Sequence, residues 1–449
     1  MDKSYLLNSP LATRLYEECA KSLPIIDYHN HLSMKDISSD GKFENITKLW
    51  ISPDPYKHRA MRILGVPEKC ITGDATDYEK FEAWYNSLPK LIGNVLFDWS
   101  EMELATVFDF PLLPFNKSAE EVWCALNEKL SEMSTKDILK KFNIKYSAPC
   151  TALCDDLAVF EGAAPFAPSL RGDDLLLPTG EVITKLSSLT KKSISTVGDY
   201  LSAIDRRLED FAKVGCRYTD HALDAGFDYA TDDGKNEERF KSLISGENMS
   251  ECDKAHLSSY ILKSIANLYA RRGLIMQLHI GAQRKTSTRL REVAGAAGGY
   301  AAIGSTFDIG KLIRLLDEVE MGKHGIPKTI LFTLNPKDNA AIANLSGSFS
   351  KDGVEAIISQ GPAWWWCDHY QGMKDMLSHL AAYGVLSTFI GMTTDSRSLL
   401  SFVRHDYFRR VLCRTLGEWA DGGLIPNDFG LLSDIVKNIC YENANKTLQ

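Results

Sequence analysis

Two histidines separated by one residue, His29 and His31, close an apolar run that begins at Ile25. On a β-strand, residues two apart face the same side, so both imidazoles can converge on one metal ion. Asp395 follows another apolar run, residues 386–392, and its carboxylate can bind the same cation or act as a base. The simplest metal site is therefore one divalent ion held by His29, His31 and Asp395. The alternative role of Asp395 is to cap the helix that follows.

Polar side chains close other apolar runs in the same way: Arg171, His279, and Asp220 with His221 as a candidate acid–base pair. A lone histidine such as His279 is more often a hydrogen-bonded structural residue than a catalyst. Arg397, two residues after Asp395, can clamp a carboxylate in fork geometry. Trp364 begins a run of three tryptophans that forms either a buried strand with an aromatic rim or a wall of the substrate pocket.

The apolar runs that must position these residues alternate with amphipathic segments. Helical periodicity covers the intervening residues 197–214, 254–272, 309–321 and 372–383. Strand followed by helix, repeated, predicts a parallel sheet covered by helices. The eight runs are residues 25–31, 145–150, 165–171, 216–220, 275–280, 328–335, 363–368 and 386–395. Eight such units predict an α/β fold of the (β/α)8 TIM-barrel type, whose catalytic residues lie at the carboxyl ends of the strands. An open doubly wound sheet is the alternative.

The division of the chain follows from one long interval without a βα unit. Residues 33–141 contain several helical stretches, so we expect a helical insertion after the first strand. Residues 1–32 and 142–449 then form the barrel, with a helical C-terminal extension. The stretch 294–304, rich in alanine and glycine, is expected to be a flexible loop after the fifth strand.

Composition narrows the class of protein without choosing an activity. The chain has 449 residues, 44% of them hydrophobic, and a formal net charge of −8. Such an acidic chain lacks the basic surface of a nucleic-acid-binding protein. No stretch is long and apolar enough for a membrane span. The ten scattered cysteines, without a C-x-x-C pair, indicate a reducing compartment, and we expect a cytoplasmic protein. The sequence leaves the oligomeric state open, with a homo-oligomer as one alternative.

At the level of whole motifs the sequence resembles the uronate isomerase family of the amidohydrolase superfamily. The resemblance runs nearly from end to end. It rests on Asp27-Tyr28-His29-Asn30-His31-Leu32, Tyr56-Lys57, Ser169-Leu170-Arg171, Thr219-Asp220-His221, Gln277-Leu278-His279-Ile280-Gly281-Ala282, Thr333-Leu334-Asn335-Pro336, Phe389-Ile390-Gly391-Met392-Thr393-Thr394-Asp395-Ser396-Arg397-Ser398 and Arg404-His405-Asp406-Tyr407-Phe408-Arg409-Arg410.

The resemblance implies a metal-bearing (β/α)8 barrel that interconverts an aldohexuronate and a ketohexuronate. The substrate pairs would be D-glucuronate with D-fructuronate and D-galacturonate with D-tagaturonate. By resemblance the metal is zinc on His29, His31 and Asp395, and a proton moves between C2 and C1 through a cis-enediol. We favour Asp395 as the base, with the phenol of Tyr56 as the alternative. The remaining residues implied are His279 in the active site, Arg171 and Arg397 on the sugar acid, and Tyr56 and Trp364 in substrate binding.

Two places depart from the family pattern. A histidine commonly precedes the tyrosine, but this chain has Pro55 there, and His58 stands two residues after Tyr56. Residues 283–305 lack the expected asparagine-rich stretch. Two alternatives therefore remain at this point. One is a mononuclear metal-dependent hydrolase of the same superfamily acting on a sugar acid, lactone or amide, and the other is a sugar-acid-binding barrel without activity. The stretch 217–221 contains no lysine, which favours a single metal.

Overall fold

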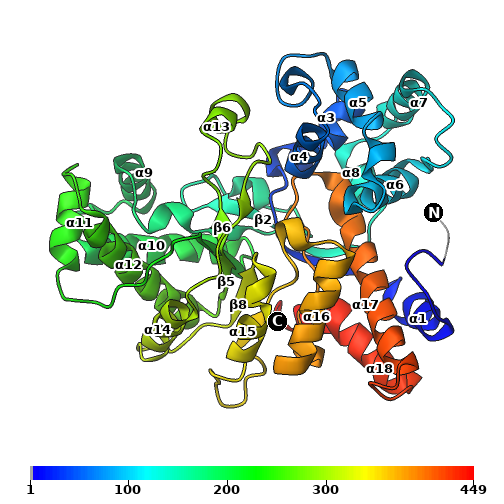
Figure 1. Ribbon diagram of the computed structural model, residues 1–449. Coiled ribbons are helices and arrows are strands. Elements are labelled where there is room, and N and C mark those ends of the chain that lie inside the picture. Colours follow the sequence, from blue (N-terminus) through cyan, green and yellow to red (C-terminus); the bar gives the residue numbers. More distant parts are fainter. Residues whose placement is uncertain (1–3) are drawn as a thin grey trace.

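The fold is built around a curled parallel sheet (Figure 1). The computed structural model describes residues 4–449. The seven strands follow one another in chain order across the sheet, and all neighbouring pairs are parallel. They are β1 (Ile25–Asn30), β2 (Ile144–Ala152), β3 (Ser169–Arg171), β4 (Tyr218–Leu223), β5 (Ile275–Ile280), β8 (Thr329–Thr333) and β9 (Ile358–Gln360). Strands β1, β5 and β8 are buried along their whole length, as in parallel sheets covered on both faces.

Residues 389–396 run beside β1 without forming a further strand of the sheet. The backbone N–H of His31 donates to the carbonyl of Ser396 at 2.9 Å. On the other side, the indole Nε1 of Trp364, which follows β9, donates to Asp395 Oδ2 at 2.6 Å. The segment therefore contacts both ends of the seven-stranded sheet. The molecule is an α/β fold whose curled sheet is consistent with a TIM-like barrel.

Most predicted runs overlap an observed strand, namely 25–31, 145–150, 165–171, 216–220, 275–280 and 328–335. The prediction for residues 363–368 is wrong, because the strand is Ile358–Gln360 and Trp365–Cys367 forms a 3-10 helix. Trp365 has a φ of +51°, in the left-handed region where a strand cannot continue. The aromatic content that predicted a strand serves packing here, since the rings of neighbouring tryptophans stack on one another.

The prediction of a strand over residues 386–395 is also wrong at its start. Leu386–Thr388 form a 3-10 helix, and the following residues are extended without a regular ladder. Gly391 has a φ of +85° and lies against the carbonyl of Ile439, where a Cβ would collide. The backbone therefore bends at this glycine before it reaches Asp395.

Helices cover the outside of the sheet. The amphipathic segments predicted between the strands are confirmed, with small shifts of their ends. The helix α14, for example, buries Leu312, Leu315, Leu316 and Val319, which share one face at helical spacing. The covering helices are α9 (Gly180–Thr190), α10 (Val197–Lys213), α11 (Asn236–Ile244), α12 (Glu251–Arg272), α14 (Ile309–Glu320), α15 (Asn339–Leu345) and α16 (Tyr370–Tyr383).

The chain between β1 and β2 contains helices and loops and, in the described residues, no strand. Serine and threonine N-caps begin several of these helices, and Thr76 and Glu79 form a capping box at α5. Pro55 occupies the first position of α4, where a missing N–H costs nothing. The helices are α2 (Met34–Ser39), α3 (Ile46–Trp50), α4 (Pro55–Ile63), α5 (Asp77–Tyr85), α6 (Val95–Phe108), α7 (Ala119–Ser131) and α8 (Thr135–Leu139).

The loop expected over residues 294–304 is seen over residues 295–301, and regular elements lie on either side of it. A short antiparallel pair, β6 (Ala282–Gln283) with β7 (Ala302–Ile303), encloses the helix α13 (Thr288–Ala294). In Figure 1 α13 projects beside α4. The β6–β7 pair holds the two ends of the segment 282–303 together near the carboxyl end of β5.

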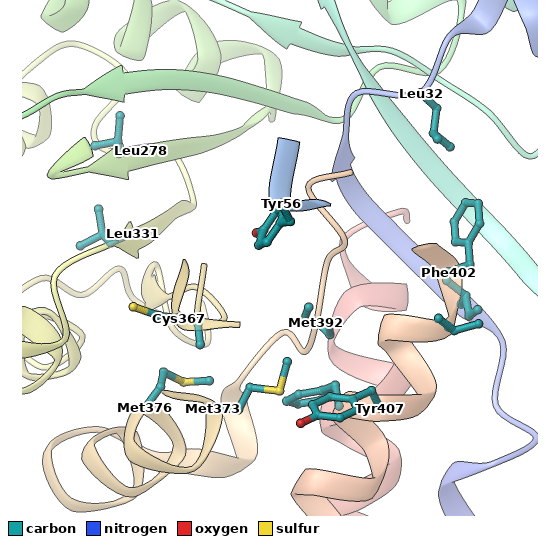
Figure 2. Packing of buried hydrophobic residues seen from close by; sticks show 14 of the residues in the cluster. Leu32, Tyr56, Leu278, Leu331, Cys367, Met373, Met376, Met392, Phe402 and Tyr407 are labelled. Atoms are coloured by element: carbon teal, nitrogen blue, oxygen red, sulfur yellow. The ribbon is translucent and has the colours of Figure 1, made fainter. Parts of the chain in front are cut away.

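The first two C-terminal helices join the other elements in one hydrophobic core, and the last one buries Ala444 in a second cluster with Ile26 and Tyr28 of β1. These helices are α17 (Val403–Asp421), α18 (Phe429–Lys437) and α19 (Asn443–Lys446), and α17 packs on α1 (Pro10–Leu15), α6 and α16. Figure 2 shows part of this core, which includes Leu278 and Leu331 of the sheet, Tyr56 of α4, Met373 of α16 and Tyr407 of α17. The helices between β1 and β2 therefore share a core with the sheet and with α17. None of the helices in residues 4–449 combines the length and hydropathy that crossing a membrane requires.

Candidate active site

A cavity of about 240 Å³ opens at the carboxyl ends of the strands. Side chains from β1, β3, β4, β5 and the segment 389–396 converge there, because the carboxyl ends of parallel strands meet at one edge. The sequence-predicted residues that line it are His29, His31, Arg171, Asp220, His279, Trp364, Asp395 and Arg397. The structure thus brings together all of the predicted site residues except Tyr56 and His221.

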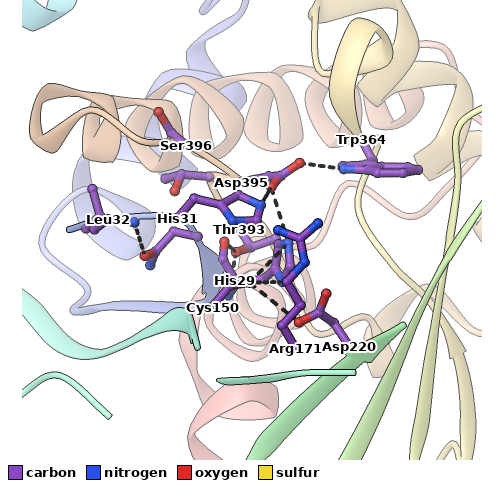
Figure 3. A network of polar contacts seen from close by, with 12 residues as sticks. His29, His31, Leu32, Cys150, Arg171, Asp220, Trp364, Thr393, Asp395 and Ser396 are labelled. Carbon is purple, nitrogen blue, oxygen red and sulfur yellow. Dashed lines mark hydrogen bonds and ion pairs between the residues drawn. The ribbon is translucent and has the colours of Figure 1, made fainter. Parts of the chain in front are cut away.

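Asp395 lies between His29 of β1 and His31, which directly follows the strand (Figure 3). Its Oδ1 is 3.2 Å from Nε2 of His29 and 3.0 Å from Nε2 of His31. Ligand atoms of a tetrahedral ion with bonds of about 2.0–2.1 Å lie roughly 3.3 Å apart. Burial alone would raise the pKa of Asp395, but hydrogen bonds from both histidines hold it well below its usual value. The group is therefore an anionic carboxylate beside two imidazoles, which is the chemistry of a divalent-metal site.

The backbone at Asp395 is strained and firmly held. Its φ is +44°, in the left-handed region that costs a non-glycine residue about 1–3 kcal/mol unless the surroundings enforce it. Its N–H donates to the carbonyl of His29 at 3.1 Å. The preceding Thr394 donates from its backbone and its hydroxyl to the buried carboxylate of Asp27, both at 2.8 Å. These bonds fix the direction in which the Asp395 carboxylate points.

A second group of ligand atoms surrounds His29. Cys150 Sγ lies 3.5 Å from His29 Nδ1 and 3.5 Å from Asp220 Oδ1. The imidazole of His279 stands beside that of His29, with ring centroids 4.4 Å apart, and its Nε2 is buried without a hydrogen-bond partner. Two triads, His29–His31–Cys150 and His29–Asp220–His279, each have ligand atoms within 4.8 Å of one another. The cavity therefore offers donor sets that suit a metal ion.

Burial sets the protonation of these neighbours. It raises the pKa of Asp220 to about 6 and that of the Cys150 thiol to about 12, and it lowers the pKa of His279 well below its usual value. Cys150 was absent from our predicted site. It ends the run 145–150, so its place at a strand end was the signal, but its residue type suggested a small buried hydrophobe.

The interpretation of Asp220 and His221 as an acid–base pair in the site is wrong. Adjacent residues of a strand face opposite sides, so only Asp220 faces the cavity. The ring of His221 is fully buried on the other side, where its Nε2 lies 3.0 Å from the hydroxyl of Tyr269. His221 is a structural residue.

Three arginines line the cavity, and they differ in their partners. Arg171 pairs with Asp173 at 3.0 Å, and Arg284 of the β6 segment pairs with Asp224 at 2.9 Å. Within residues 4–449, Arg397 forms no hydrogen bond or ion pair. A guanidinium with five donors and no protein acceptor suits a bound carboxylate.

Tyr56 lies next to the cavity and does not line it. It lines a neighbouring cavity of about 500 Å³, and its hydroxyl donates to Asp368 Oδ2 at 2.8 Å. Burial raises the pKa of Asp368 to about 7. Asp368 ends the run 363–368, yet the sequence offered no means of pairing it with Tyr56, which lies 312 residues away.

The two departures from the family pattern meet in space. One wall of the cavity is formed by Pro55 together with Ala296, Ala297, Gly299 and Ala301. Gly299 has a φ of +78° and packs on the carbonyl of Pro55 so closely that a Cβ would collide with it. Arg59 and Trp366 hold this wall by donating to the carbonyl of Ala301 at 3.2 and 3.1 Å. His58 is buried outside the cavity and does not replace the missing histidine.

Comparison with known proteins agrees with this geometry. A family model described as glucuronate isomerase matches residues 1–448. The chain is 39% identical to the uronate isomerase of Caldanaerobacter subterraneus subsp. tengcongensis, over 99% of this chain and 98% of that protein. It is 40% identical to the uronate isomerase of Bacillus pumilus, over 100% of this chain and 96% of that protein. The solved structure of uronate isomerase from Thermotoga maritima matches with a TM-score of 0.92 at 27% identity, covering 100% of this chain and 99% of that one.

These similarities extend over the whole chain, and they support an isomerase over a metal-dependent hydrolase. The cavity at the strand ends carries the histidines, carboxylate and arginines that belong to the motifs on which the resemblance to this family rested. The chain belongs to the glucuronate isomerase family, and it is an enzyme that isomerises uronates.

Proposed function

We propose that this cavity interconverts D-glucuronate with D-fructuronate and D-galacturonate with D-tagaturonate through a cis-enediol. Asp395, beside His29 and His31, shares the cavity with Arg397, which has no partner within the described chain. This juxtaposition carries the proposal. One group can move a proton while the other holds the carboxylate of the sugar acid.

His29, His31 and Asp395 are the proposed ligands of one divalent ion, which we infer to be zinc. Their donor atoms, two imidazole nitrogens and a carboxylate oxygen, suit that ion. The unpartnered Nε2 of His279 on the same cavity supports a site built for a ligand. When bound, the ion would act as a Lewis acid that favours negative charge on the oxygens of the enediolate.

Asp395 is the proposed base. It would take the proton from C2 of the aldose and return it to C1, while the proton of the C2 hydroxyl passes to the oxygen on C1, and the reverse reaction uses the same group. A largely buried carboxylate held by fixed hydrogen bonds needs little reorganisation to act. The hydrogen bond from Trp364 to Oδ2 keeps the carboxylate turned toward the cavity.

Arg397 and Arg171 are proposed to bind the substrate carboxylate, and Trp364 to pack against the sugar carbons. Arg397 contributes the guanidinium with no protein partner, while Arg171 is held in place by Asp173. His279 and Tyr56 complete the proposed set. His279 is uncharged because burial depresses its pKa. The phenol of Tyr56 would have to leave Asp368 to reach the substrate.

We also propose that residues 33–141 form a helical insertion in a barrel made of residues 1–32 and 142–449. Helix α4 contributes Pro55 to the wall of the cavity and Tyr56 to the neighbouring cavity. These contacts support a functional role for the insertion. The cytoplasm is the proposed compartment, because all ten cysteines are free thiols.

A screen of hexuronates tests the proposed function. Purified enzyme with its metal content measured is mixed with D-glucuronate and with D-galacturonate, and ketouronate is measured. We expect turnover of at least one of them. Failure to convert any hexuronate, by folded and metal-loaded protein, would contradict the proposal.

Removal of the metal is expected to lower both activity and stability. A ligand present at 100 times its dissociation constant stabilises the native state by about 2.7 kcal/mol, so its loss should lower the unfolding temperature by several degrees. Zinc should restore both properties after dialysis against a chelator. Calorimetry and an activity assay on the same samples provide the measurement. A metal-free protein with native activity and an unchanged unfolding temperature would refute a catalytic metal.

Replacing Gly299 with alanine is expected to lower kcat/KM by about tenfold. The new Cβ would collide with the carbonyl of Pro55, so the wall of the cavity must move, and a displacement of 1 Å near a reacting centre can cost about 100-fold. Gly295 is the matched control, because it has a φ of +69° but open space around it. If Gly295→Ala and Gly299→Ala have the same kcat/KM, the contact with Pro55 has no role in shaping the cavity.

A further inference from the structure

Arg404, near the start of α17, is buried behind the proposed metal site. Only 1% of its surface is exposed, and its guanidinium carbon lies 4.0 Å from the ring centroid of Trp99 and 4.8 Å from that of Tyr56. Its Nη1 is 3.5 Å from Asp368 Oδ2, the oxygen that also accepts from Tyr56. The side chain therefore lies between two aromatic rings and one carboxylate.

The same Nη1 donates to the backbone carbonyl of Thr394 at 3.1 Å. That carbonyl begins the peptide unit whose N–H belongs to Asp395, the residue with a φ of +44°. Within the described chain no other group donates to the Thr394 carbonyl. Asp27 and His29 accept hydrogen bonds from the backbone N–H groups of Thr394 and Asp395. The carbonyl of Thr394 is held by Arg404 instead.

We propose that Arg404 is a positioning residue that fixes the direction of the Asp395 carboxylate and couples it to the Tyr56–Asp368 pair. The proposal rests on the proposed roles of Asp395 and Tyr56, and it adds a residue outside the cavity to them. Arg404 does not line the cavity, so it acts through other groups and not on the substrate.

The chemistry of the site explains the choice of arginine. A planar guanidinium can donate to a carbonyl and a carboxylate at once while its faces contact aromatic rings. A lysine at this position keeps the charge and has three donors for the two acceptors, but it has no planar face for Trp99. We therefore expect Arg404→Lys to restore only part of what Arg404→Met removes.

The experiment compares Arg404→Met and Arg404→Lys with Arg409→Met. Arg409 is also buried on α17 but donates to the carbonyl of Pro24, away from the cavity. Substitution of residues that support metal ligands typically costs about 10- to 100-fold in metal affinity or activity. Arg404→Met should lower kcat by at least tenfold with KM changed less than threefold, and should weaken Zn²⁺ binding measured by chelator competition. Arg404→Lys should fall between it and the native enzyme, and Arg409→Met should keep native kcat and Zn²⁺ affinity.

Each outcome decides the question. Native kcat and Zn²⁺ affinity in a folded Arg404→Met, or equal losses in Arg404→Met and Arg409→Met, would overturn the positioning role. If Arg404→Met does not fold, Arg404→Lys decides, since lowered kcat at an unchanged unfolding temperature supports the role and native kcat overturns it. Failure of the proposed function is seen separately, as native activity in Asp395→Asn.

Discussion

Asp395→Asn is expected to lower kcat by at least about 100-fold, because general-base catalysis contributes about 10²- to 10⁴-fold. The amide keeps the size of the side chain, but it cannot accept a proton and it is a poorer metal ligand than a carboxylate. Native Asp395 is ionised and lies within 3.2 Å of the imidazoles of His29 and His31. Steady-state kinetics with the preferred hexuronate, at saturating zinc, provide the measurement.

Two comparisons isolate the cause of this loss. Asp352→Asn changes an exposed carboxylate in a surface loop and should keep native kcat. The metal content of Asp395→Asn separates the two proposed roles, since a variant that keeps its metal and loses kcat has lost the base. A variant with near-native kcat would remove Asp395 from the mechanism.

Arg397→Met is expected to raise KM for a hexuronate by about 10- to 100-fold. A hydrogen bond to a charged group contributes about 1.5–3 kcal/mol, and every 1.4 kcal/mol changes an equilibrium constant tenfold. Arg397 lines the cavity without a protein partner in residues 4–449, so its loss leaves no buried carboxylate of the protein uncompensated. The effect should therefore fall on substrate binding.

Arg397→Lys should recover part of the affinity, because it restores the charge without the fork of two parallel donors. Arg289→Met, an exposed arginine on α13, is the control for loss of one positive charge near the cavity. Measurements at two salt concentrations separate a direct contact from long-range attraction, which salt screens. An unchanged KM in Arg397→Met would place the substrate carboxylate elsewhere.

The strand-end residues could be predicted because a parallel sheet converts chain order into proximity. His29, Arg171, Asp220, His279 and Asp395 each follow or end an apolar run, and the carboxyl ends of such runs meet at one edge. The same rule separates Asp220 from its neighbour, since alternation along a strand places only one of two adjacent residues in the cavity.

The features that could not be predicted from the sequence depend on tertiary contacts. Arg404 looks like one more basic residue of a charged helix, and only the folded chain shows it beneath Thr394. The shift of a predicted strand to Ile358–Gln360 has a similar cause, because tryptophans suit both a strand and a stacked turn. Gly299 and Pro55 lie in the two stretches that depart from the family pattern. They are in contact although 244 residues separate them in the sequence, and no local pattern predicts this contact.

The most direct test of the central claim is an NMR experiment in deuterated water with metal-loaded enzyme and D-glucuronate or D-galacturonate. Formation of an enediol intermediate transfers the C2 proton of the aldose to a base, from which it can exchange with solvent during repeated turnover. The account predicts a ketouronate that carries deuterium at C1, together with deuterium at C2 of the recovered aldose. Ketouronate that forms with no solvent deuterium after prolonged incubation at equilibrium would contradict proton transfer by Asp395.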